Sequence, residues 1–495
     1  MICFRRFRGG RERNLTDCCT ELNEGFGVEP SAASGFRVEH DSLGQVRVPA
    51  AALWQAQTQR AVENFAISGE RVHPEVIRSL LLIKRAAAQS NGQLGVVSAS
   101  VADAIGRACD QLLQGDLQQE FPVDVFQTGS GTSTNMNVNE VISTLASNHL
   151  GEKVHPNDHV NASQSSNDVF PTAVHIAVLT RVERTLIPSL QNLLNSLRLK
   201  ESEWAGVVKA GRTHLMDAVP VTLGQEFGGY ATAVSLGIDR IHATQQRVSS
   251  LPLGGTAVGT GLNAPPEFAS LTIEKLSLDL GLSMHEATNH FEAQGGQDSL
   301  VECSGACRVV AISLNKIASD LRWMSSGPAA GLGELSLPAL QPGSSIMPAK
   351  VNPVIPEVVH QVVAQVIGND AAIGFAGASG NFELNVMIPV MARNLLESLD
   401  LLSSATLALS EKCVRGSVAH ESVLLANAER SSALVTALVP LIGYEAASRI
   451  AQKAQAEGSS IREELLNEGL LTATQIESAL DLLEMTKGRS ELPNH

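Results

Sequence analysis

Aromatic residues are scarce in this sequence: of its 495 residues only 4% are Phe, Trp or Tyr, whereas 44% are hydrophobic. The core must therefore be built mainly from Ala, Val, Leu and Ile. Small aliphatic side chains suit closely packed helices better than a β-sandwich, whose strands usually draw on aromatic residues. The length exceeds that of one ordinary domain, so we expect several domains or one extended helical architecture.

Long hydrophobic runs are also missing, and none approaches the ~18 residues that a membrane-spanning helix needs. Basic residues are outnumbered, with 36 Lys and Arg against 51 Asp and Glu, which gives a formal charge of −15. A nucleic-acid-binding protein normally has a basic face. We therefore expect neither a membrane nor a nucleic acid as a partner. An anionic substrate would need locally placed donors and cations.

The seven cysteines are an odd number in a long chain, and Cys303 and Cys307 lie four residues apart without two further soft ligands nearby. Free thiols explain this pattern better than a disulfide framework or a metal site. His155 and His159 alone would make an incomplete metal site, because Pro156 lies between them and a regular helix face is not shared. The sequence thus predicts a reducing, cytoplasmic location and no bound metal.

The first part of the chain, residues 1–35, has no sustained periodicity and carries five arginines among its first 13 residues. An Arg-rich, acid-poor start is typical of a targeting segment, but acidic residues follow soon after Arg13. We predict a disordered extension, with a targeting segment or a start site placed too early as the alternatives. Alternating residues from Phe36 to Val48 predict two short strands, and helical periodicity begins near Val76.

Long helical segments dominate the rest of the chain. They are predicted at about 171–203, 223–250, 300–325 and 356–373. A helix of ~30 residues spans ~45 Å, which is longer than one globular domain needs. The fourth segment has two apolar rows, so a broad face of it is apolar. Such helices need partners on several sides, and we predict a long bundle that assembles with other copies of itself.

Four polar segments rich in glycine or serine interrupt the helical pattern. They lie at 128–132, 163–168, 211–214 and 343–352. Most of them precede a predicted helix, whose free N–H groups and positive dipole end suit a carboxylate. Simple helix capping by Ser, Thr or Asp is the commoner explanation for the first two. In the third, His214 is expected in a loop immediately before a helix, although a lone histidine is usually a surface or core residue.

The fourth segment is the most informative. Gly343 gives backbone freedom, two serines follow it, and Pro348 and Pro353 limit helix formation. Lys350 and Asn352 alternate within an extended stretch, so both can face one side. A loop with hydroxyls, a cation and an amide is suited to close over an anion.

This segment, G-S-S-x-M-P-x-K-x-N, resembles the signature of the fumarase/aspartase superfamily of lyases at all seven fixed positions. The other three segments match the same superfamily in order. Within it the chain looks most like the class II fumarases, from segments 213–218, 289–293 and 380–386. The resemblance implies a mainly α fold with an N-terminal mixed domain, a central bundle of long helices and a small helical C-terminal domain. These domains are expected at 36–164, 165–420 and 421–495.

The same resemblance implies an enzyme that interconverts fumarate and (S)-malate without a cofactor, as a homotetramer whose active sites are shared between subunits. The residues that match the substrate carboxylate binders are Ser130, Thr132, Asn167, Lys350 and Asn352, supported by Ser165, Ser166 and Thr213. Three residues match catalytic positions. Ser344 matches the proposed base, His214 handles the departing hydroxyl through water, and Glu357 holds the imidazole.

Two features keep alternatives open. The family's second, non-catalytic anion site is matched by His155, Asn157 and Asp158, but Glu152 falls about where some members have Arg. Ala349 and the residues that follow Asn352 read like an aspartase, so aspartate ammonia-lyase is the alternative activity. A catalytically inactive structural protein, a fate known among lens crystallins of this superfamily, is the alternative from another class.

Overall fold

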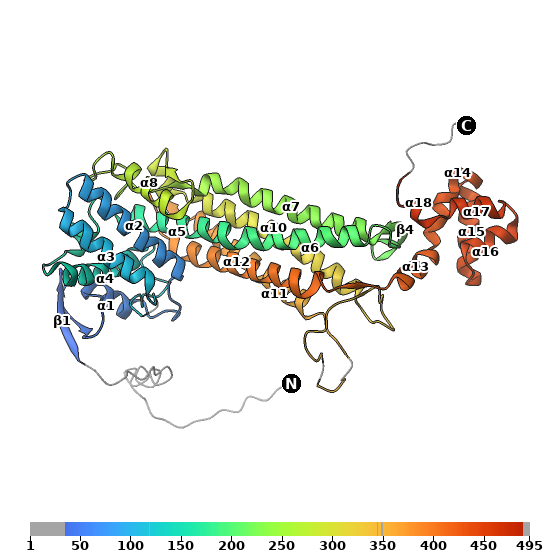
Figure 1. The fold of residues 1–495 in the computed structure, drawn as a ribbon, viewed down its shortest axis with the longest axis horizontal. Coiled ribbons are helices and arrows are strands. Elements are labelled where there is room, and N and C mark those ends of the chain that lie inside the picture. The colour runs from blue at the N-terminus through green and yellow to red at the C-terminus, as the bar shows by residue number, and fades with distance from the viewer. Residues whose placement is uncertain (1–34, 118, 344, 348–349, 489–495) are drawn as a thin grey trace, which may run out of the picture.

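The structure is a computed structural model that describes residues 35–117, 119–343, 345–347 and 350–488. Figure 1 shows an elongated helical molecule, with the N-terminal region at one end of a long bundle and the last helices at the other. Within the described residues, strands form only five two-stranded sheets. The prediction of a mainly α fold is therefore confirmed. Nearly all of the predicted extension, residues 1–34, lies outside the described residues.

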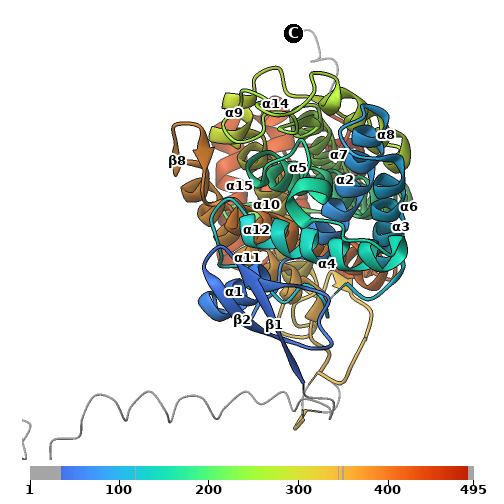
Figure 2. The same cartoon turned by 90° about the vertical axis from the view of Figure 1, so that its left-hand side faces the viewer.

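The N-terminal region begins with the predicted hairpin, in which two antiparallel strands pair from Phe36 with Pro49 to Asp41 with Gly44. Four helices follow, and α2 begins at Pro74 because His73 caps it by accepting a hydrogen bond from the Glu75 backbone N–H. The elements are β1 (Phe36–Asp41), β2 (Gly44–Pro49), α1 (Ala56–Asn64), α2 (Pro74–Gln93), α3 (Ala99–Gln114) and α4 (Thr132–Leu150). Seen from this end, α2, α3 and α4 lie beside one another across the end of the bundle (Figure 2).

The central bundle contains the long helices that periodicity predicts, and each of the four predicted segments is helical. The first is continuous from Ser166 to Glu203, although five residues within it form a π-turn. A further long helix, α12, was not predicted. The bundle elements are α5 (Ser166–Arg181), η2 (Val182–Leu186), α6 (Ile187–Glu203), α7 (Leu223–Val248), α10 (Asp298–Met324), α11 (Val354–Gly377) and α12 (Ile388–Leu409). Their shared core is almost entirely aliphatic, which agrees with the low aromatic content.

Shorter elements connect the long helices. The strands β3 and β4 form a hairpin between α6 and α7, at the end of the bundle opposite α4 (Figure 1). The connecting elements are η1 (Pro156–Val160), β3 (Val208–Thr213), β4 (Met216–Thr222), β5 (Ser250–Leu251), α8 (Phe268–Leu280), β6 (His285–Glu286), α9 (His290–Gly295), β7 (Leu335–Ser336), β8 (Gly380–Asn381), β9 (Leu384–Asn385), η3 (Ser410–Val414) and β10 (Val418–Ala419). None of the helices in the described ranges is long and apolar enough to cross a membrane.

The C-terminal helices have a small hydrophobic core of their own, which includes Leu438, Ile450, Leu465 and Ile476. Serine or threonine caps fix the starts of η4, α16 and α17; Ser460, for example, forms a capping box with Glu463. The elements are α13 (Glu421–Glu429), η4 (Ser432–Leu438), α14 (Val439–Ile442), α15 (Tyr444–Glu457), α16 (Ile461–Glu468), α17 (Ala473–Ala479) and α18 (Leu482–Met485). The exact domain boundaries at 164 and 420 stay predictions.

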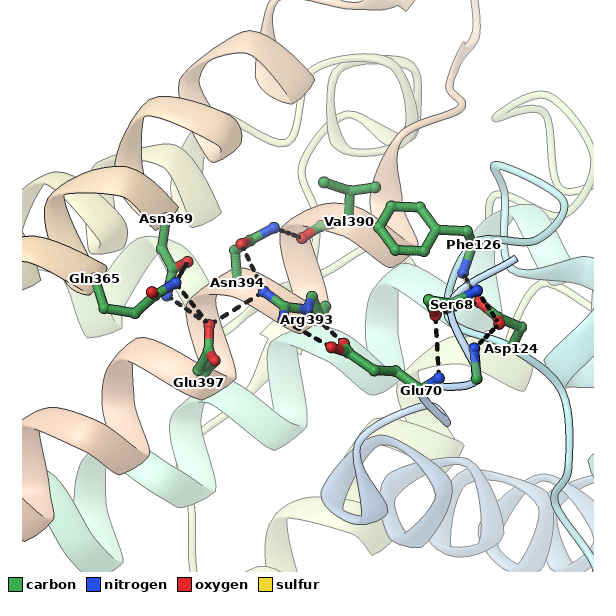
Figure 3. Close-up of polar contacts among 11 residues, drawn as sticks. Ser68, Glu70, Asp124, Phe126, Gln365, Asn369, Val390, Arg393, Asn394 and Glu397 are labelled. Carbon is green, nitrogen blue, oxygen red and sulfur yellow. Dashed lines mark hydrogen bonds and ion pairs between the residues drawn. The ribbon is translucent and has the colours of Figure 1, made fainter. Parts of the chain in front are cut away.

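Arg393 on α12 joins the N-terminal region to the bundle (Figure 3). Its guanidinium donates to both carboxylate oxygens of Glu70, at 2.8 and 3.1 Å, and to Glu397 on α12 at 3.1 Å. Glu397 in turn accepts a hydrogen bond from Asn369 on α11 at 2.9 Å. Asp124 secures the loop that carries Glu70, because it accepts the backbone N–H groups of residues 68, 69 and 126. One charged network thus links three parts of the chain.

Candidate functional site

Three of the predicted site residues form one cluster where α4 and α5 begin. The Ser130 and Thr132 hydroxyls lie 2.8 Å apart, and the Thr132 and Ser166 hydroxyls lie 2.7 Å apart. We call these three residues the hydroxyl cluster. Both helices point their N-termini at it, so N–H groups and positive dipole ends converge with the hydroxyls. This arrangement suits an anion such as a carboxylate.

Two glycines explain how the loop before α4 reaches this place. A Cβ at Gly129 would lie 1.8 Å from the carbonyl oxygen of Val386, and the Gly129 carbonyl itself accepts the Ile388 N–H at 3.2 Å. Gly131 has φ of +73°, and a Cβ there would lie 2.2 Å from the Phe170 ring. The glycines are therefore required by close packing against α12 and α5, and no phosphate-binding role is needed to explain them.

Ser165 and Asn167 serve the structure as well as the site. Ser165 is the N-cap of α5 and forms a capping box with Asp168, which supports the capping interpretation for both residues. Asn167 donates through Nδ2 to the carbonyl of Ala257 at 2.8 Å. The second Asp168 oxygen accepts the backbone N–H groups of Gly254 and Thr256, and burial raises the pKa of this carboxyl group. The glycine-rich segment near residue 254 is thus hydrogen-bonded to the first turn of α5.

The position expected for His214 is wrong in one respect. His214 lies in the tight turn between β3 and β4, and the next helix begins only at Leu223. His214 and Leu215 both have positive φ, 55° and 60°, although neither is glycine. We call residues 213–216 the hairpin turn. Its residues, Thr213 and His214 among them, are exposed. Backbone strain of this kind at a polar, exposed residue is typical of functional positions.

Ion pairs hold the base of the β3–β4 hairpin, and a cavity lies beside its turn. Arg212 donates to both oxygens of the fully buried Glu334 side chain, at 2.9 and 2.5 Å. Lys209 lies 2.8 Å from Glu226. A cavity of about 710 Å³ adjoins His214 and is also lined by Lys316, Asp320 and Trp323 of α10, among other residues.

We call residues 343–352 the signature loop, and the two ends of this loop contact each other. A Cβ at Gly343 would lie 2.1 Å from the Lys350 carbonyl oxygen, so only glycine fits there. The Asn352 side-chain amide donates to the Gly343 carbonyl at 2.6 Å. Lys350, Asn352 and Glu357 line a cavity of about 430 Å³ together with the end of α10. Ser344, the predicted base, lies outside the described residues.

The structure does not bring all predicted residues together within one chain. The continuous helix from Ser166 to Glu203 is roughly 55 Å long, so it separates the hydroxyl cluster from the hairpin turn (Figure 1). His214 and Glu357 adjoin two different cavities, with Trp323 lining both. In the described ranges no hydrogen bond joins His214 to Glu357, and their pairing stays a prediction.

The residues of the predicted second anion site lie together at the start of η1, with His155 just before it. His155 caps this π-turn, because its Nδ1 accepts the N–H groups of Asn157 and Asp158 at 3.2 and 3.1 Å. The Asp158 side chain is 77% exposed. The geometry has a sufficient local explanation in capping, and anion binding here stays a prediction.

Sequence reasoning missed one polar residue behind the hydroxyl cluster. Lys84 of α2 is fully buried and donates to Asn161 and Gln164, close to the start of α5. A signal was available: Lys84 follows the apolar run from Leu80 to Ile83 and lies on the helix face of Leu80 and Ala87. A charged residue on the apolar face of a helix indicates a buried hydrogen-bond partner.

Comparison with known proteins shows which family the chain resembles. The family model described as lyase matches residues 44–368, and the model described as fumarase C C-terminus matches residues 434–487. A relative from Mycobacterium tuberculosis, fumarate hydratase class II, is 54% identical over 92% of this chain and 97% of its own length. A relative of the same name from Corynebacterium efficiens is 55% identical over 91% of this chain and 96% of its own.

A solved structure agrees with these sequence relatives. The crystal structure of class II fumarase from Schistosoma mansoni has a TM-score of 0.89 and 38% identity, and the match covers 91% of this chain and 99% of that one. The chain therefore belongs to the lyase family and, within it, to the class II fumarases.

Proposed function

We propose that this chain is a hydro-lyase that catalyses the reversible hydration of fumarate to (S)-malate. The observation that carries the proposal is its identity of 54% to an enzyme named fumarate hydratase class II over 92% of the chain. The convergence of three hydroxyls and two helix N-termini supports a site for a dicarboxylate.

The substrate carboxylates are assigned to donors from both ends of the bundle. At one end, Ser130, Thr132, Ser166 and Asn167 supply hydroxyls and an amide, with Ser165 in support. From the other segments, Lys350, Asn352 and Thr213 complete the set. Because the overall charge is negative, these local donors have to hold the dianionic substrate.

The difficult step is removal of a carbon-bound proton beside a carboxylate, which creates a dianionic aci-carboxylate. Donors aimed at that group before the charge develops lower the barrier. Ser344 is assigned as the base, and the Gly-Ser-Ser turn with nearby Lys350 would stabilise its alkoxide. His214 handles the departing hydroxyl through a water molecule, and Glu357 orients its imidazole. No metal or cofactor is assigned to the reaction.

The working unit is a homotetramer in which each active site combines segments of different subunits. The separation of the hydroxyl cluster from the hairpin turn supports this, since one chain does not join them. Apolar side chains on the long helices support it as well, because several of them are exposed in the single chain: Ile312 at 51%, Val358 at 43%, Ile367 at 44% and Phe375 at 71%. A cytoplasmic location stays a prediction.

The test is to offer malate and aspartate separately to the purified enzyme while fumarate absorbance is followed. We expect fumarate from malate and none from aspartate. Fumarate formed only from aspartate would make the chain an aspartate ammonia-lyase instead. Turnover of neither substrate, with the protein folded, would favour the catalytically inactive alternative. Wild-type activity that disappears in Ser344→Ala tests the base assignment directly.

A further inference from the structure

A lysine without a contacting carboxylate is buried behind the hydroxyl cluster. Lys84 has no exposed surface. Its Nζ donates to the Asn161 Oδ1 at 2.8 Å and to the Gln164 Oε1 at 3.0 Å, and both partners are neutral amides. Among the ion pairs of the described residues, none involves Lys84. Burial lowers its pKa, but the buried Asp168 carboxylate at the start of α5 acts on it electrostatically and raises the pKa against that effect. Lysine is almost never fully buried unless it is paired, so a specific need for this side chain is indicated.

The first partner, Asn161, is a junction between two helices. Its Oδ1 accepts not only from Lys84 on α2 but also from the amides of Asn135 and Asn139 on α4, each at 3.2 Å. Its own amide donates to the Gln164 carbonyl at 3.1 Å. Because the oxygen receives three N–H donors, its orientation is fixed. Lys84 thereby ties the turn at residues 161–164 to both α2 and α4.

The same face of α2 holds this turn at a second point. Asn91 lies seven residues after Lys84, which is about two helical turns. Its amide donates to the Ala162 carbonyl at 2.9 Å, and its oxygen accepts the Ser163 hydroxyl at 2.8 Å. Ser163 has a positive φ of 62°, a conformation that needs such support in a residue other than glycine.

The turn leads directly into the substrate-binding residues. Ser165 to Asn167 follow it, and Ser166 contacts Thr132, which begins the helix that carries Asn135 and Asn139. We propose that Lys84 is a positioning residue, which fixes Ser166 and Asn167 relative to Thr132 through its hydrogen bonds to Asn161 and Gln164. This inference rests on the proposed function, because it assumes that these residues bind the substrate.

The chemistry of the side chain explains why a lysine is needed. An ammonium group has three donors on a flexible stem, so one residue satisfies two amide oxygens that approach from one side. A methionine would fill a similar volume but leave both oxygens without this donor. The turn would then lose its link to α2 at this point, while the reacting groups at the hairpin turn and the signature loop would be untouched.

The experiment is steady-state kinetics with fumarate on the full-length enzyme and on Lys84→Met, Ser163→Ala and Lys200→Met. We expect Lys84→Met to raise KM about 10-fold with kcat changed less than about threefold. The reason is that the bound substrate and the transition state would lose the same amount of binding energy. Ser163→Ala removes one of the two hydrogen bonds between Asn91 and the turn without altering a buried charge, and should raise KM about threefold. Lys200→Met is the matched control.

Lys200 is also a buried lysine, 8% exposed, but it lies on α6 near the opposite end of the bundle, where it donates to the Ser417 carbonyl and forms an ion pair with Glu203. Its replacement should leave KM unchanged. If Lys84→Met does not fold, the KM of Ser163→Ala tests the proposal in its place. The positioning role is wrong if neither variant changes KM more than twofold while Ser166→Ala raises it. If Ser166→Ala itself has no effect on KM, the proposed site at this end of the bundle is wrong.

Discussion

The hydroxyl cluster and the hairpin turn lie at opposite ends of the bundle and differ in how the chain supports them. The hydroxyls of Ser130, Thr132 and Ser166 are bonded to one another, and buried amides and a buried lysine lie behind them. In contrast, the hairpin turn is exposed, with Leu215 at 66% and Met216 at 70%. One half of the proposed site is thus supported within the chain, and the other half is exposed on the surface of the single chain.

Stability and function are therefore divided differently at the two ends of the bundle. Groups that carry both substrate binding and structure cannot be removed without a cost to both. Groups that extend from a strained, exposed turn have little packing to lose. Substitutions at the two ends should therefore have different signatures in kinetics and in unfolding.

The largest effect is expected for His214→Asn. Loss of an acid–base group should lower kcat about 100-fold or more, with the melting temperature unchanged because the side chain is exposed. Rates measured beside thermal unfolding would check this. The matched control is His242→Asn, another exposed histidine, which contacts only Gln245 on its own helix in the described structure. A near-normal kcat for His214→Asn would show that the hairpin turn has no catalytic role.

The second prediction concerns mixtures of two variants, each altered at a different end of the bundle. Chains with His214→Asn and chains with both Thr132→Val and Ser166→Ala should each be weakly active alone. If sites combine segments of different subunits, co-refolded mixtures will contain some intact sites and exceed the summed activities of the separate variants. Activity assays and the mass in solution, against 52.3 kDa for one chain, are the measurements. Active monomers would contradict the shared site.

A smaller effect in kinetics, but a distinct one in stability, is expected for Ser166→Ala. Loss of a donor to a carboxylate should raise KM about 10-fold, and loss of the contact with Thr132 should lower the free energy of unfolding by about 1 kcal/mol. Kinetics and denaturant unfolding would be measured on the same preparation. An effect on KM without any loss of stability would remove the contrast between the two ends.

A further effect, on stability and not on kinetics, concerns pH. Burial lowers the pKa of Lys84 from 10.5 to about 7, so between these values the unfolded chain binds the proton more tightly than the folded one. The free energy of unfolding should therefore rise with pH through this window, relative to that of Lys84→Met, in which residue 84 carries no titratable group. Denaturant unfolding of both proteins at pH 6.5 and 9, at equal protein concentration, measures the difference. A difference independent of pH would show that Lys84 keeps its charge throughout.

Four of the five long helical segments of the bundle and the family could be read from the amino-acid sequence alone, whereas α12 could not. The spacing of aliphatic residues in α7, α10 and α11 is a local property, because one face of each helix must be buried. The signature at Gly343 to Asn352 and the three other polar segments are enough to identify the superfamily, and they contain all three residues of the hydroxyl cluster. These features depend on neighbours along the chain and can be seen there.

The placement of the segments relative to one another depends on contacts between distant parts of the chain. The turn at His214 contains no glycine or asparagine to announce its positive φ values, so its hairpin could not be distinguished from a loop before a helix. The partners of Lys84 lie about 80 residues away along the chain, at Asn161 and Gln164, and no local pattern specifies them. The distance between the hydroxyl cluster and the hairpin turn follows from the rigid helix between them, since hydrogen bonds along its length fix that distance.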